Sequence, residues 1–367
     1  ASIANKGFSE RITTAPFSPL GHNTRVKTKN ATCMALATNQ PIAPTRNTAE
    51  MRAMNQEQPF LPIYHYAVVT DAIEGLVLVN VDTLADGEFR NNKLKRAVFA
   101  NGAKAWNEGG VLDGARHVQL AGEIAYITTP RALVVLDLSD PLDPQVAAVR
   151  ELDDARASAI QFRYLWVTDA GGVKLFDVTN LRNPVRMPQG DVPLANAQRL
   201  YLARTYAYVA AKQEGLVIVD ITRPLSPRVH QRVTLDGQLN DAEDVIVATT
   251  NASLIGYVAD GRNGFKVLQL TSPSSQPNFY GFSPPPVPEL IAWAKTKGPA
   301  LALSKGLDRD RAVDETGGQM AVFGRLGSRP FTRAEMEKLF LTRSGVPWKV
   351  SDEVDMSAWV PGTGPRR

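Results

Sequence analysis

The sequence predicts an all-β fold, a β-propeller of six or seven blades, and two observations support this. One apolar string recurs five times at spacings of 40 to 57 residues, which is the repeat length of propeller blades. A second strand pattern precedes each copy, and a polar or Pro-punctuated loop follows it. The five copies are EGLVLVNVDTL (Glu74 to Leu84), RALVVLDLSDPLDP (Arg131 to Pro144), GGVKLFDVTNLRNP (Gly171 to Pro184), EGLVIVDITRPLSP (Glu214 to Pro227) and NGFKVLQLTSPSSQP (Asn263 to Pro277).

The alignment of the copies predicts equivalent strand positions. The residues in register are Leu76, Leu133, Val173, Leu216 and Phe265. The preceding strands read AVVTDA, AYITT, LWVTDA, AYVAA and GYVADG, and their continuous apolar character suits strands that are buried on both faces between neighbouring blades. One blade cannot bury both faces alone, so the motif has to recur around a ring.

The turns and strand ends of the repeat carry their own signals. Glycine stands before four of the five aligned positions, where the hairpin needs a positive φ, and Arg131-Ala132 is the exception, so we expect the second blade to turn differently. An aspartate ends the strand in three copies and stands two positions later in a fourth. These aspartates are Asp137, Asp177, Asp220 and Asp82. We expect Asx-type caps rather than metal ligands, since one carboxylate per blade does not form an oxygen cage.

The GLVIVDI string, the YVAA strand before it and the Pro loop after it resemble the LVIVD repeat family over about Tyr64 to Phe282. The resemblance implies a β-propeller in an exported or cell-surface bacterial protein, hence a periplasmic or extracellular location. It implies no catalytic residues. Some large LVIVD-type proteins look fused to multihaem cytochrome regions, so the resemblance suggests a multihaem cytochrome as one protein partner.

Three regions are expected: an extended N-terminal arm over 1–62, the propeller over 63–330, and a C-terminal helix and tail over 331–367. The arm shows no repeat and contains six prolines. We expect it to bind a partner through apolar anchors and basic side chains. These arm residues are Phe8, Phe17, Lys27 and Lys29.

The blades beyond the five clear copies have to come from the flanks. Residues 299–327 contain a pattern that fits a decayed hairpin of the same frame. The string PFTRAEMEKLFLTRSG behind it predicts a helix, with Thr332 as N-cap, Glu335 at the capping-box position and Gly345 as C-cap.

Composition excludes several function classes. The net charge is +4, and the first sixty residues hold seven Lys and Arg against three acids. This diffuse excess, without a basic helix, does not favour nucleic-acid binding. No window approaches the roughly 20 apolar residues of a membrane helix. The chain begins with Ala1 rather than Met, which fits signal removal but equally fits a fragment of a longer precursor.

No metal or cofactor is predicted. The string KNATCMALATNQ around the single cysteine, Cys33, resembles the surroundings of a c-type haem site, but Leu36 and Ala37 stand where the second cysteine and the histidine are needed. The four histidines show no zinc spacing. They are His22, His65, His117 and His230.

One polar constellation remains. Four strings share a frame just before the first strand of successive blades, LDGARHV, LDDARAS, LANAQRL and LNDAEDV. If the first strand is innermost, their polar side chains converge at one mouth of the central channel. This mouth ring consists of Arg116, His117, Asp153, Arg156, Gln198, Arg199, Asp241, Glu243 and Asp244. A solvated, mutually ion-paired rim is favoured over a binding funnel for a small ligand or partner.

The sequence therefore favours a non-catalytic scaffold that mediates protein–protein interaction in an exported assembly, which the family resemblance links to cytochromes. The alternative is an enzyme or small-ligand-binding propeller that uses the mouth ring. Fold alone does not choose between the two classes. The absence of an identifiable nucleophile or metal in the ring favours the scaffold.

Overall fold

The structure is a computed structural model that describes residues 26–36, 62–81, 94–249, 253–277 and 283–304, with two short strands at 325–326 and 329–330. The chain divides into two compact units. One comprises Thr28–Val79 and Arg96–Lys305, and it contains the repeats. The other comprises Ala1–Lys27, Asn80–Lys95 and Gly306–Arg367. In the latter, β22 (Arg325–Leu326) pairs antiparallel with β23 (Arg329–Pro330).

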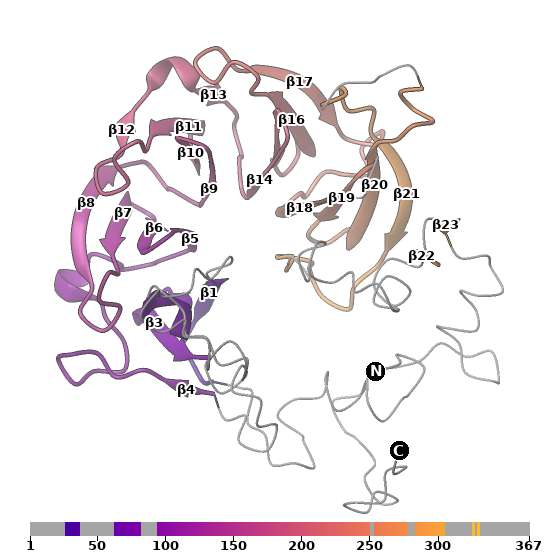
Figure 1. The fold of residues 1–367 in the computed structure, drawn as a ribbon. Coiled ribbons are helices and arrows are strands. Elements are labelled where there is room, and N and C mark those ends of the chain that lie inside the picture. Colours follow the sequence, from indigo (N-terminus) through magenta and orange to yellow (C-terminus); the bar gives the residue numbers. More distant parts are fainter. Residues whose placement is uncertain are drawn as a thin grey trace, which may run out of the picture. The chain divides into compact units, whose positions relative to one another are not determined.

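The repeat unit consists of five antiparallel sheets, which are the blades of a propeller. Four sheets have four strands, and the third has five. Figure 1 shows them fanned around a centre, with the first strand of each blade innermost and the last on the rim. The strands of blades 1 and 2 are β1 (Ala31–Leu36), β2 (Tyr66–Asp71), β3 (Gly75–Asn80), β4 (Lys95–Arg96), β5 (His117–Ala121), β6 (Ile124–Thr129), β7 (Ala132–Asp137) and β8 (Gln145–Glu151).

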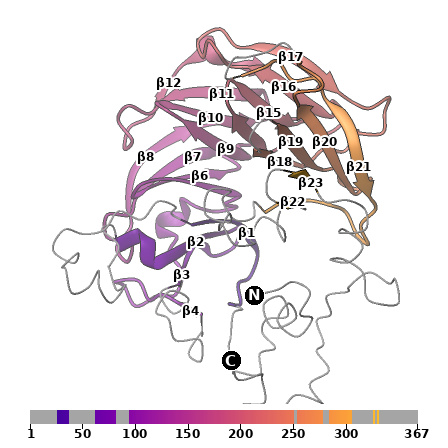
Figure 2. The ribbon, with the colours of Figure 1, turned by 45° about the vertical axis from the view of Figure 1, so that its right-hand side comes forward.

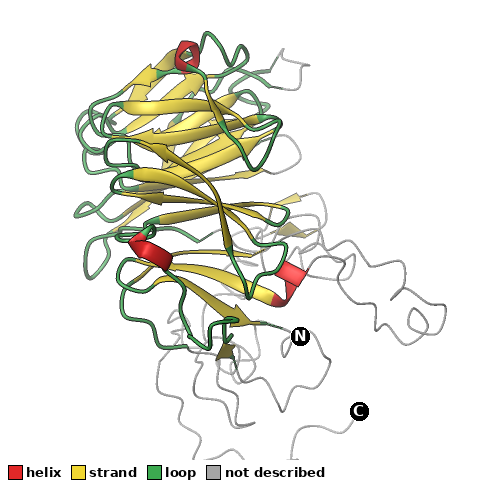
Figure 3. Ribbon diagram, turned by 90° about the vertical axis from the view of Figure 1, so that its left-hand side faces the viewer, coloured by secondary structure: helices red, strands yellow, loops and turns green. Residues whose placement is uncertain are grey.

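Blades 3 to 5 repeat this pattern. Their strands are β9 (Ala157–Gln161), β10 (Tyr164–Asp169), β11 (Gly172–Asp177), β12 (Val185–Arg186), β13 (Val192–Pro193), β14 (Leu200–Ala203), β15 (Tyr206–Ala210), β16 (Leu216–Asp220), β17 (Arg228–Val233), β18 (Asp244–Thr249), β19 (Leu254–Ala259), β20 (Phe265–Thr271) and β21 (Glu289–Ala294). The described helices are single 3-10 turns, which stand out in Figure 3 against the strands. They are Pro62–His65, Glu108–Gly110 and Pro188–Gly190.

The predicted register of the five copies is confirmed. Each aligned residue stands at the start of the third strand of its blade. Where the pairing with the second strand is given, Leu133 faces Thr128, Val173 faces Thr168, Leu216 faces Ala210 and Phe265 faces Ala259. The repeated string therefore forms the same strand in every blade.

The core consists of apolar layers between neighbouring blades. Alternate residues of β16 show how the layers arise: Val217 belongs to the same buried cluster as Trp166 of blade 3, whereas Ile218 belongs to the same cluster as Leu268 of blade 5. Both faces of the strand are fully buried, because successive side chains in a strand point to opposite sides. The continuous apolar strings are therefore explained by burial on two faces.

The glycine signal at the hairpins is confirmed, and Gly215 shows its cause. Its φ is +71°, and a Cβ at this position would lie 2.2 Å from the carbonyl oxygen of Val233. Only glycine relieves both restrictions. Blade 2 turns differently, as expected: the Thr129 hydroxyl accepts hydrogen bonds from the backbone N–H groups of Arg131 and Ala132.

The predicted aspartate caps are confirmed where the structure describes them. Asp137, Asp177 and Asp220 each accept a hydrogen bond from the backbone N–H two residues later, at 2.8 to 2.9 Å. This is the Asx-type geometry that ends a strand in a turn. The fourth aspartate, Asp82, lies outside the described residues.

Two fold predictions are corrected. The described residues build five blades rather than six or seven, because residues 286–294 lead into the outer strand of blade 5 and residues 325–330 form only a two-stranded ladder. Part of the expected arm is a blade strand: β1 pairs with β2 and forms the inner strand of blade 1. The predicted C-terminal helix and the anchors Phe8 and Phe17 lie outside the described residues.

Candidate functional site

The inner strands place one residue of each blade at the same position. In blades 1, 2 and 3 this residue lies opposite the next-to-last residue of the second strand. In blades 4 and 5 it lies opposite the corresponding residue, which is Ala210 or Ala259. The five residues at this position are Cys33, His117, Ala157, Arg199 and Asp244. Consecutive inner strands lie side by side around the centre (Figure 1). The shared frame therefore brings chemically different side chains together.

Four of these residues form a contact cluster, which we call the thiol cluster: Cys33, His117, Arg199 and Asp244. Arg199 of blade 4 reaches blade 1, where Nη1 lies 3.7 Å from Cys33 Sγ and Nη2 donates to the carbonyl oxygen of Thr32 at 3.1 Å. His117 of blade 2 lies beside Cys33 and lowers the pKa of its thiol. Asp244 Oδ2 of blade 5 lies 4.0 Å from Arg199 Nε.

The surroundings of the cluster shift the pKa of two of its groups. Burial raises the pKa of the Cys33 thiol, but the neighbouring His117, the charge of Arg199 and the Val118 backbone N–H together outweigh burial, and the pKa falls from 9.0 to about 6. Burial raises the pKa of Asp244, although the Leu303 backbone N–H and Arg199 oppose it. The surroundings of Cys33 therefore favour the thiolate form of its side chain.

His117 is oriented by its neighbour in blade 3. Its Nδ1 accepts a hydrogen bond from the backbone N–H of Ser158 at 3.3 Å. In the neutral ring, the proton consequently resides on Nε2. The imidazole is then a hydrogen-bond donor on the side away from Ser158.

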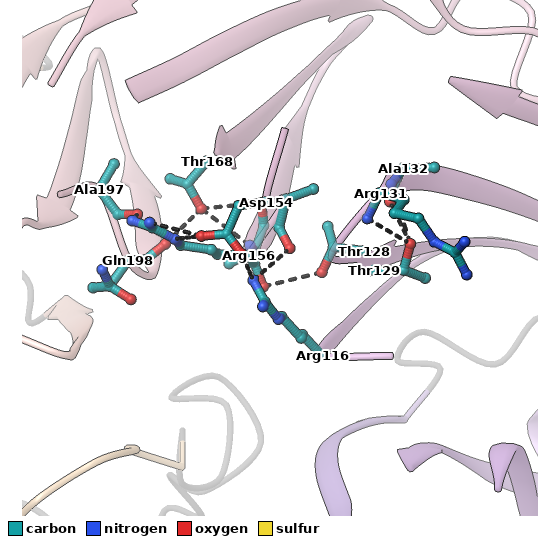
Figure 4. A network of polar contacts seen from close by, with 12 residues as sticks. Arg116, Thr128, Thr129, Arg131, Ala132, Asp154, Arg156, Thr168, Ala197 and Gln198 are labelled. Carbon is teal, nitrogen blue, oxygen red and sulfur yellow. Dashed lines mark hydrogen bonds and ion pairs between the residues drawn. The ribbon is translucent and has the colours of Figure 1, made fainter. Parts of the chain in front are cut away.

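A second group of mouth-ring residues is ion-paired. Asp154 lies between the guanidinium groups of Arg116 and Arg156 (Figure 4), at 2.6 Å and 2.8 Å. Arg156 also donates to the carbonyl oxygen of Ala197 in blade 4 at 2.7 Å. Burial raises the pKa of Asp154, but the hydrogen bonds and charges of the two arginines lower it further, so that it lies below its ordinary value. These contacts link three consecutive blades.

The junction of blades 4 and 5 has its own ion-pair group. Lys212 Nζ donates to Asp241 Oδ1 at 3.3 Å and contacts Glu243 Oε1. Its backbone exchanges hydrogen bonds with Ala242. The cation thus pairs with two of the three ring carboxylates of blade 5, and Arg262 Nε also lies 3.5 Å from Asp241 Oδ2.

Threonine hydroxyls connect the other blades beneath the ring. Thr128 donates to the carbonyl oxygen of Arg156 at 3.0 Å, and Thr168 donates to that of Gln198 at 2.5 Å (Figure 4). Both threonines are fully buried. Blade 4 has Ala210 at the equivalent position, so its junction relies on Lys212 instead.

The residues predicted to form the mouth ring fall into the groups described above. Arg116 and Arg156 join the Asp154 group, Asp241 and Glu243 join the Lys212 group, and His117, Arg199 and Asp244 join the thiol cluster. Gln198 contributes its carbonyl oxygen to Thr168, and its side chain donates to Asn196. Asp153 is exposed, and its carbonyl oxygen accepts a hydrogen bond from Ala170.

Sequence reasoning missed three participants, namely Cys33, Asp154 and Lys212. Asp154 directly precedes the shared alanine of its string, so the same frame could have included it. Lys212 follows the second strand of blade 4 and could have been found by aligning those strands. Cys33 carried no repeat signal, because β1 lies in a segment that resembles no other inner strand.

The remaining features set limits on the chemistry. Among the described residues, no group of three or more His, Cys, Asp or Glu side chains could hold a metal ion. A cavity of about 400 Å³ lies in the β4–β5 connection and at the blade 2 loop, but no mouth-ring residue lines it; its lining includes Phe99, Trp106, Glu108 and Leu142. In the part of the chain that the structure describes, no helix is long and apolar enough to cross a membrane.

The blade sheets, the inner strands and the interblade core define the chain as a β-propeller. The LVIVD repeat family matches two segments, residues 114–148 and 195–234, which cover strands of blades 2 and 4. The chain therefore contains LVIVD repeats in these two segments, in agreement with the sequence resemblance. No curated protein matches the sequence.

Several solved structures match parts of this chain at low sequence identity. A protein from Lactobacillus plantarum is 12% identical, with a TM-score of 0.49, over 76% of this chain and 74% of that one. A putative 6-phosphogluconolactonase from Bacteroides fragilis is 9% identical, with a TM-score of 0.44, over 63% and 68%. The designed protein Ika8 is 13% identical, with a TM-score of 0.37, over 55% of each chain.

Proposed function

We propose that the chain is a propeller scaffold that binds a protein partner through its rim. The observation that supports this best is the outer strand of blade 5, β21. Trp293 and Ile291, which alternate on this edge strand, have 62% and 47% of their surface exposed. Figure 2 shows β21 along the outside of its blade. Exposed tryptophan on a rigid edge is the residue type that most often anchors a protein interface.

The neighbouring rim strand provides the contrast. The exposed positions of β17 carry Arg228, His230, Gln231 and Arg232, which are polar and need no cover. An apolar edge strand is a template for association unless a partner covers it. The two strands have the same place in their blades. The outer strands of blades 2 and 3 expose smaller apolar side chains, namely Val146, Val149 and Val185, so the exposed tryptophan favours β21 as the anchor of a binding edge.

The mouth ring supports the same proposal. Most of its charged groups are already ion-paired, chiefly with Asp154 and Lys212, which leaves few free groups for a polar ligand. The alternative function, an enzyme or small-ligand binder at the mouth, is supported by one group only, the thiol cluster. The scaffold is therefore preferred.

Location and partner identity belong to the proposal. The resemblance to LVIVD proteins supports an exported, periplasmic or extracellular assembly and a multihaem cytochrome as the candidate partner. Lys27 and Lys29 are exposed and would meet acidic groups of that partner, with Phe8 and Phe17 as apolar anchors. Exposed lysines should mainly aid encounter and weaken with salt.

Site-specific photocross-linking in the native extract tests the proposal. A photoreactive residue at position 293 should capture one defined partner, whereas the same residue at position 231 on β17 should not. The visible spectrum of the captured complex then shows whether the partner carries haem. Equal capture at both positions, or none at 293, would contradict a binding role for the β21 edge.

A further inference from the structure

One junction of the propeller differs from the others. Consecutive inner strands pack on each other, β1 on β5, β5 on β9, β9 on β14 and β14 on β18, but among the described residues β18 does not pack on β1 in this way. These two strands are the ends of the row of inner strands (Figure 1). Blades 1 and 5 therefore each turn one face of their sheet toward a sector that no described blade fills, which we call the open sector.

The wall that blade 5 presents to the open sector is apolar and only half-buried. In blades 2, 3 and 4 one aromatic residue of the second strand packs against the following blade. These residues are Tyr126, Trp166 and Tyr208, and at most 1% of their surface is exposed. Tyr257 has the same place in blade 5, but it is half-buried and stacks on Phe265, with ring centroids 5.9 Å apart. Its other neighbours on this wall are half-buried as well, namely Ile246, Ile255 and Val267.

The wall that blade 1 presents to the open sector is exposed too. Met34 of β1 lies opposite Val69, and it has 58% of its surface exposed. Leu36, two residues further along the same face, has 50% exposed. The residues at the position of Met34 in the other blades have only 1 to 8% exposed, and they are Val118, Ser158, Leu200 and Val245. Positions that are buried at every other junction are thus exposed at this one.

We propose that the open sector binds a β-hairpin of a partner protein that is apolar on both faces and takes the place of a further blade. This rests on the proposed function, a scaffold for a protein partner, and names the segment that the partner contributes. The end of a repeat array that faces solvent needs a polar outer face. Both walls are apolar instead, which marks an interaction surface. A hairpin between them would be buried on both faces, as β16 is between blades 3 and 5.

The chain itself provides an edge to which such a hairpin can pair. Gly261 and Ala300 exchange backbone hydrogen bonds of 3.0 and 2.8 Å, and the same bridge occurs where the chain enters β18. The segment after Ala300 therefore stands where the inner strand of a following blade begins. The Leu303 backbone N–H donates to Asp244 Oδ2 at 2.8 Å and holds this segment beside β18. It belongs to none of the described sheets, so a partner strand can add to it by main-chain hydrogen bonds.

The surroundings of the sector favour a small, uncharged occupant. Arg199 of blade 4 reaches blade 1 across the centre, where Nη2 donates to the carbonyl oxygen of Thr32 at 3.1 Å. A second five-bladed chain would meet both walls at once only by opening this contact, whereas a hairpin of blade size would leave it intact. None of the wall residues named above is charged, so a charged strand would lose its hydration there without gaining an ion pair.

The test uses the full chain and a fluorescent synthetic peptide that copies residues 206–220, the hairpin of blade 4 that is buried on both faces. Fluorescence anisotropy should show saturable binding of this peptide to the native chain. Tyr257→Asp on one wall and Met34→Asp on the other should each weaken binding about tenfold or more, because a buried charge would face the peptide. The peptide with Ile218→Asp should fail to bind for the same reason.

Two control variants make the test specific. Val149→Asp is the matched control, because Val149 is an exposed apolar residue of the outer strand β8 and lies away from the open sector. Trp293→Ala removes the anchor of the β21 edge, but Trp293 lies opposite Lys266 and is out of step with the wall residues. Both variants should bind the peptide as the native chain does. Circular dichroism establishes that each variant is folded, and Met34, which is exposed, tests the sector even if the Tyr257 variant unfolds.

Two results would overturn the proposal. One is a native chain that does not bind the peptide, or that binds it equally well with Tyr257→Asp and Met34→Asp. The other is a photoreactive residue at position 34 that, in the purified protein, cross-links to a later segment of the same chain or to a second copy, since the sector would then have that occupant. Either result would leave capture at position 293 unaffected, so the failure of this proposal is distinguishable from that of the β21 edge.

Discussion

Blade 1 and the four other blades reach the same architecture by different routes. In blades 2, 3 and 4 a two-residue turn joins the inner strand to the second strand, as between Ala121 and Ile124, and blade 5 is also continuous in sequence. In blade 1 the residues 37–65 separate β1 from β2. Side chains hold β1 in place: Asp71 Oδ2 accepts from the Asn30 N–H at 2.6 Å, and Glu74 Oε2 accepts from the Lys29 N–H at 2.9 Å.

The difference shows what replaces a short turn. Closing a long segment costs more chain entropy than closing a hairpin. In blade 1 two carboxylates and the Thr32 hydroxyl, which donates to the carbonyl oxygen of Ala115 in blade 2 at 2.8 Å, supply additional bonds to β1. In blade 2 the position of Asp71 is occupied by Thr129, whose hydroxyl accepts hydrogen bonds only within the hairpin of its own blade. The strand β1 also contains Cys33 and thereby places it in the thiol cluster.

The largest effect is expected in the core that all blades share. Val217→Asp places a charge in the layer between blades 3 and 4, where Val217 is fully buried. An unpaired buried charge should destabilise the chain by several kcal/mol. Thermal unfolding measures the effect. A shift of only a degree or two would show that Val217 faces solvent.

Asp71→Ala sharpens the comparison directly. Asp71 is fully buried and accepts hydrogen bonds from the backbone N–H groups of Asn30, Ile73 and Glu74. Its loss should cost about 2–4 kcal/mol, because several donors lose their acceptor. The matched control is Asp169→Ala in blade 3, where the carboxylate binds one backbone N–H and lies 3.6 Å from Lys174. If urea unfolding showed that both variants lose the same free energy of unfolding, Asp71 would have no special role in holding β1.

Thr32→Val tests the hydroxyl contact between blades 1 and 2. The hydroxyl also contacts Thr70 Oγ1 at 3.0 Å. We expect a loss of about 1–2 kcal/mol, because Val keeps the shape but leaves the Ala115 carbonyl oxygen without its donor. Thr128→Val at the next junction should cost a similar amount. A negligible loss in both would show that water replaces the hydroxyl.

The smallest effect concerns pH. Burial raises the pKa of Asp71, but four backbone N–H groups lower it further, and the Arg96 hydrogen bond leads the causes that lower the pKa of Glu74. A depressed folded pKa gives stability that is present above the unfolded pKa of about 4 and is lost as pH falls through the folded value. Melting temperature should therefore decline below about pH 4. Asp71→Asn should flatten this decline, and an unchanged profile would exclude Asp71 as a source.

Sequence reasoning predicted the parts of the fold that depend on local pattern. Strand identity, hairpin glycines and Asx caps follow from periodicity and from backbone restrictions at single residues such as Gly215 and Asp177. The mouth ring followed from the same frame, since His117, Arg199 and Asp244 share one strand position. The ion pairs of the mouth ring could not be predicted, because Asp154 and Lys212 form them with residues of neighbouring blades.

Two features were beyond this reasoning for physical reasons. The sequence of β1, ATCMAL, has no repeat neighbour and no turn that ties it to β2, so only long-range pairing defines it as a strand of blade 1. The blade count was overestimated because the pattern at 299–327, expected to form a hairpin of a further blade, contributes only β22 of a two-stranded ladder among the described residues. The surroundings of Cys33 depend on the pairing of β1 with β2, since His117 and Arg199 lie beside it only when β1 is innermost.

Hydrogen exchange of β1 tests the central claim most directly. The claim is that residues 31–36 form the inner strand of blade 1 and bring Cys33 into the centre. At neutral pH the β1 amides that bond to β2 should show protection factors comparable to those of β5 in blade 2, and Asp71→Ala should reduce protection in β1 but not in β5. Amides of β1 that exchange as fast as an unfolded chain, while β5 stays protected, would contradict both the assignment of β1 and the thiol cluster.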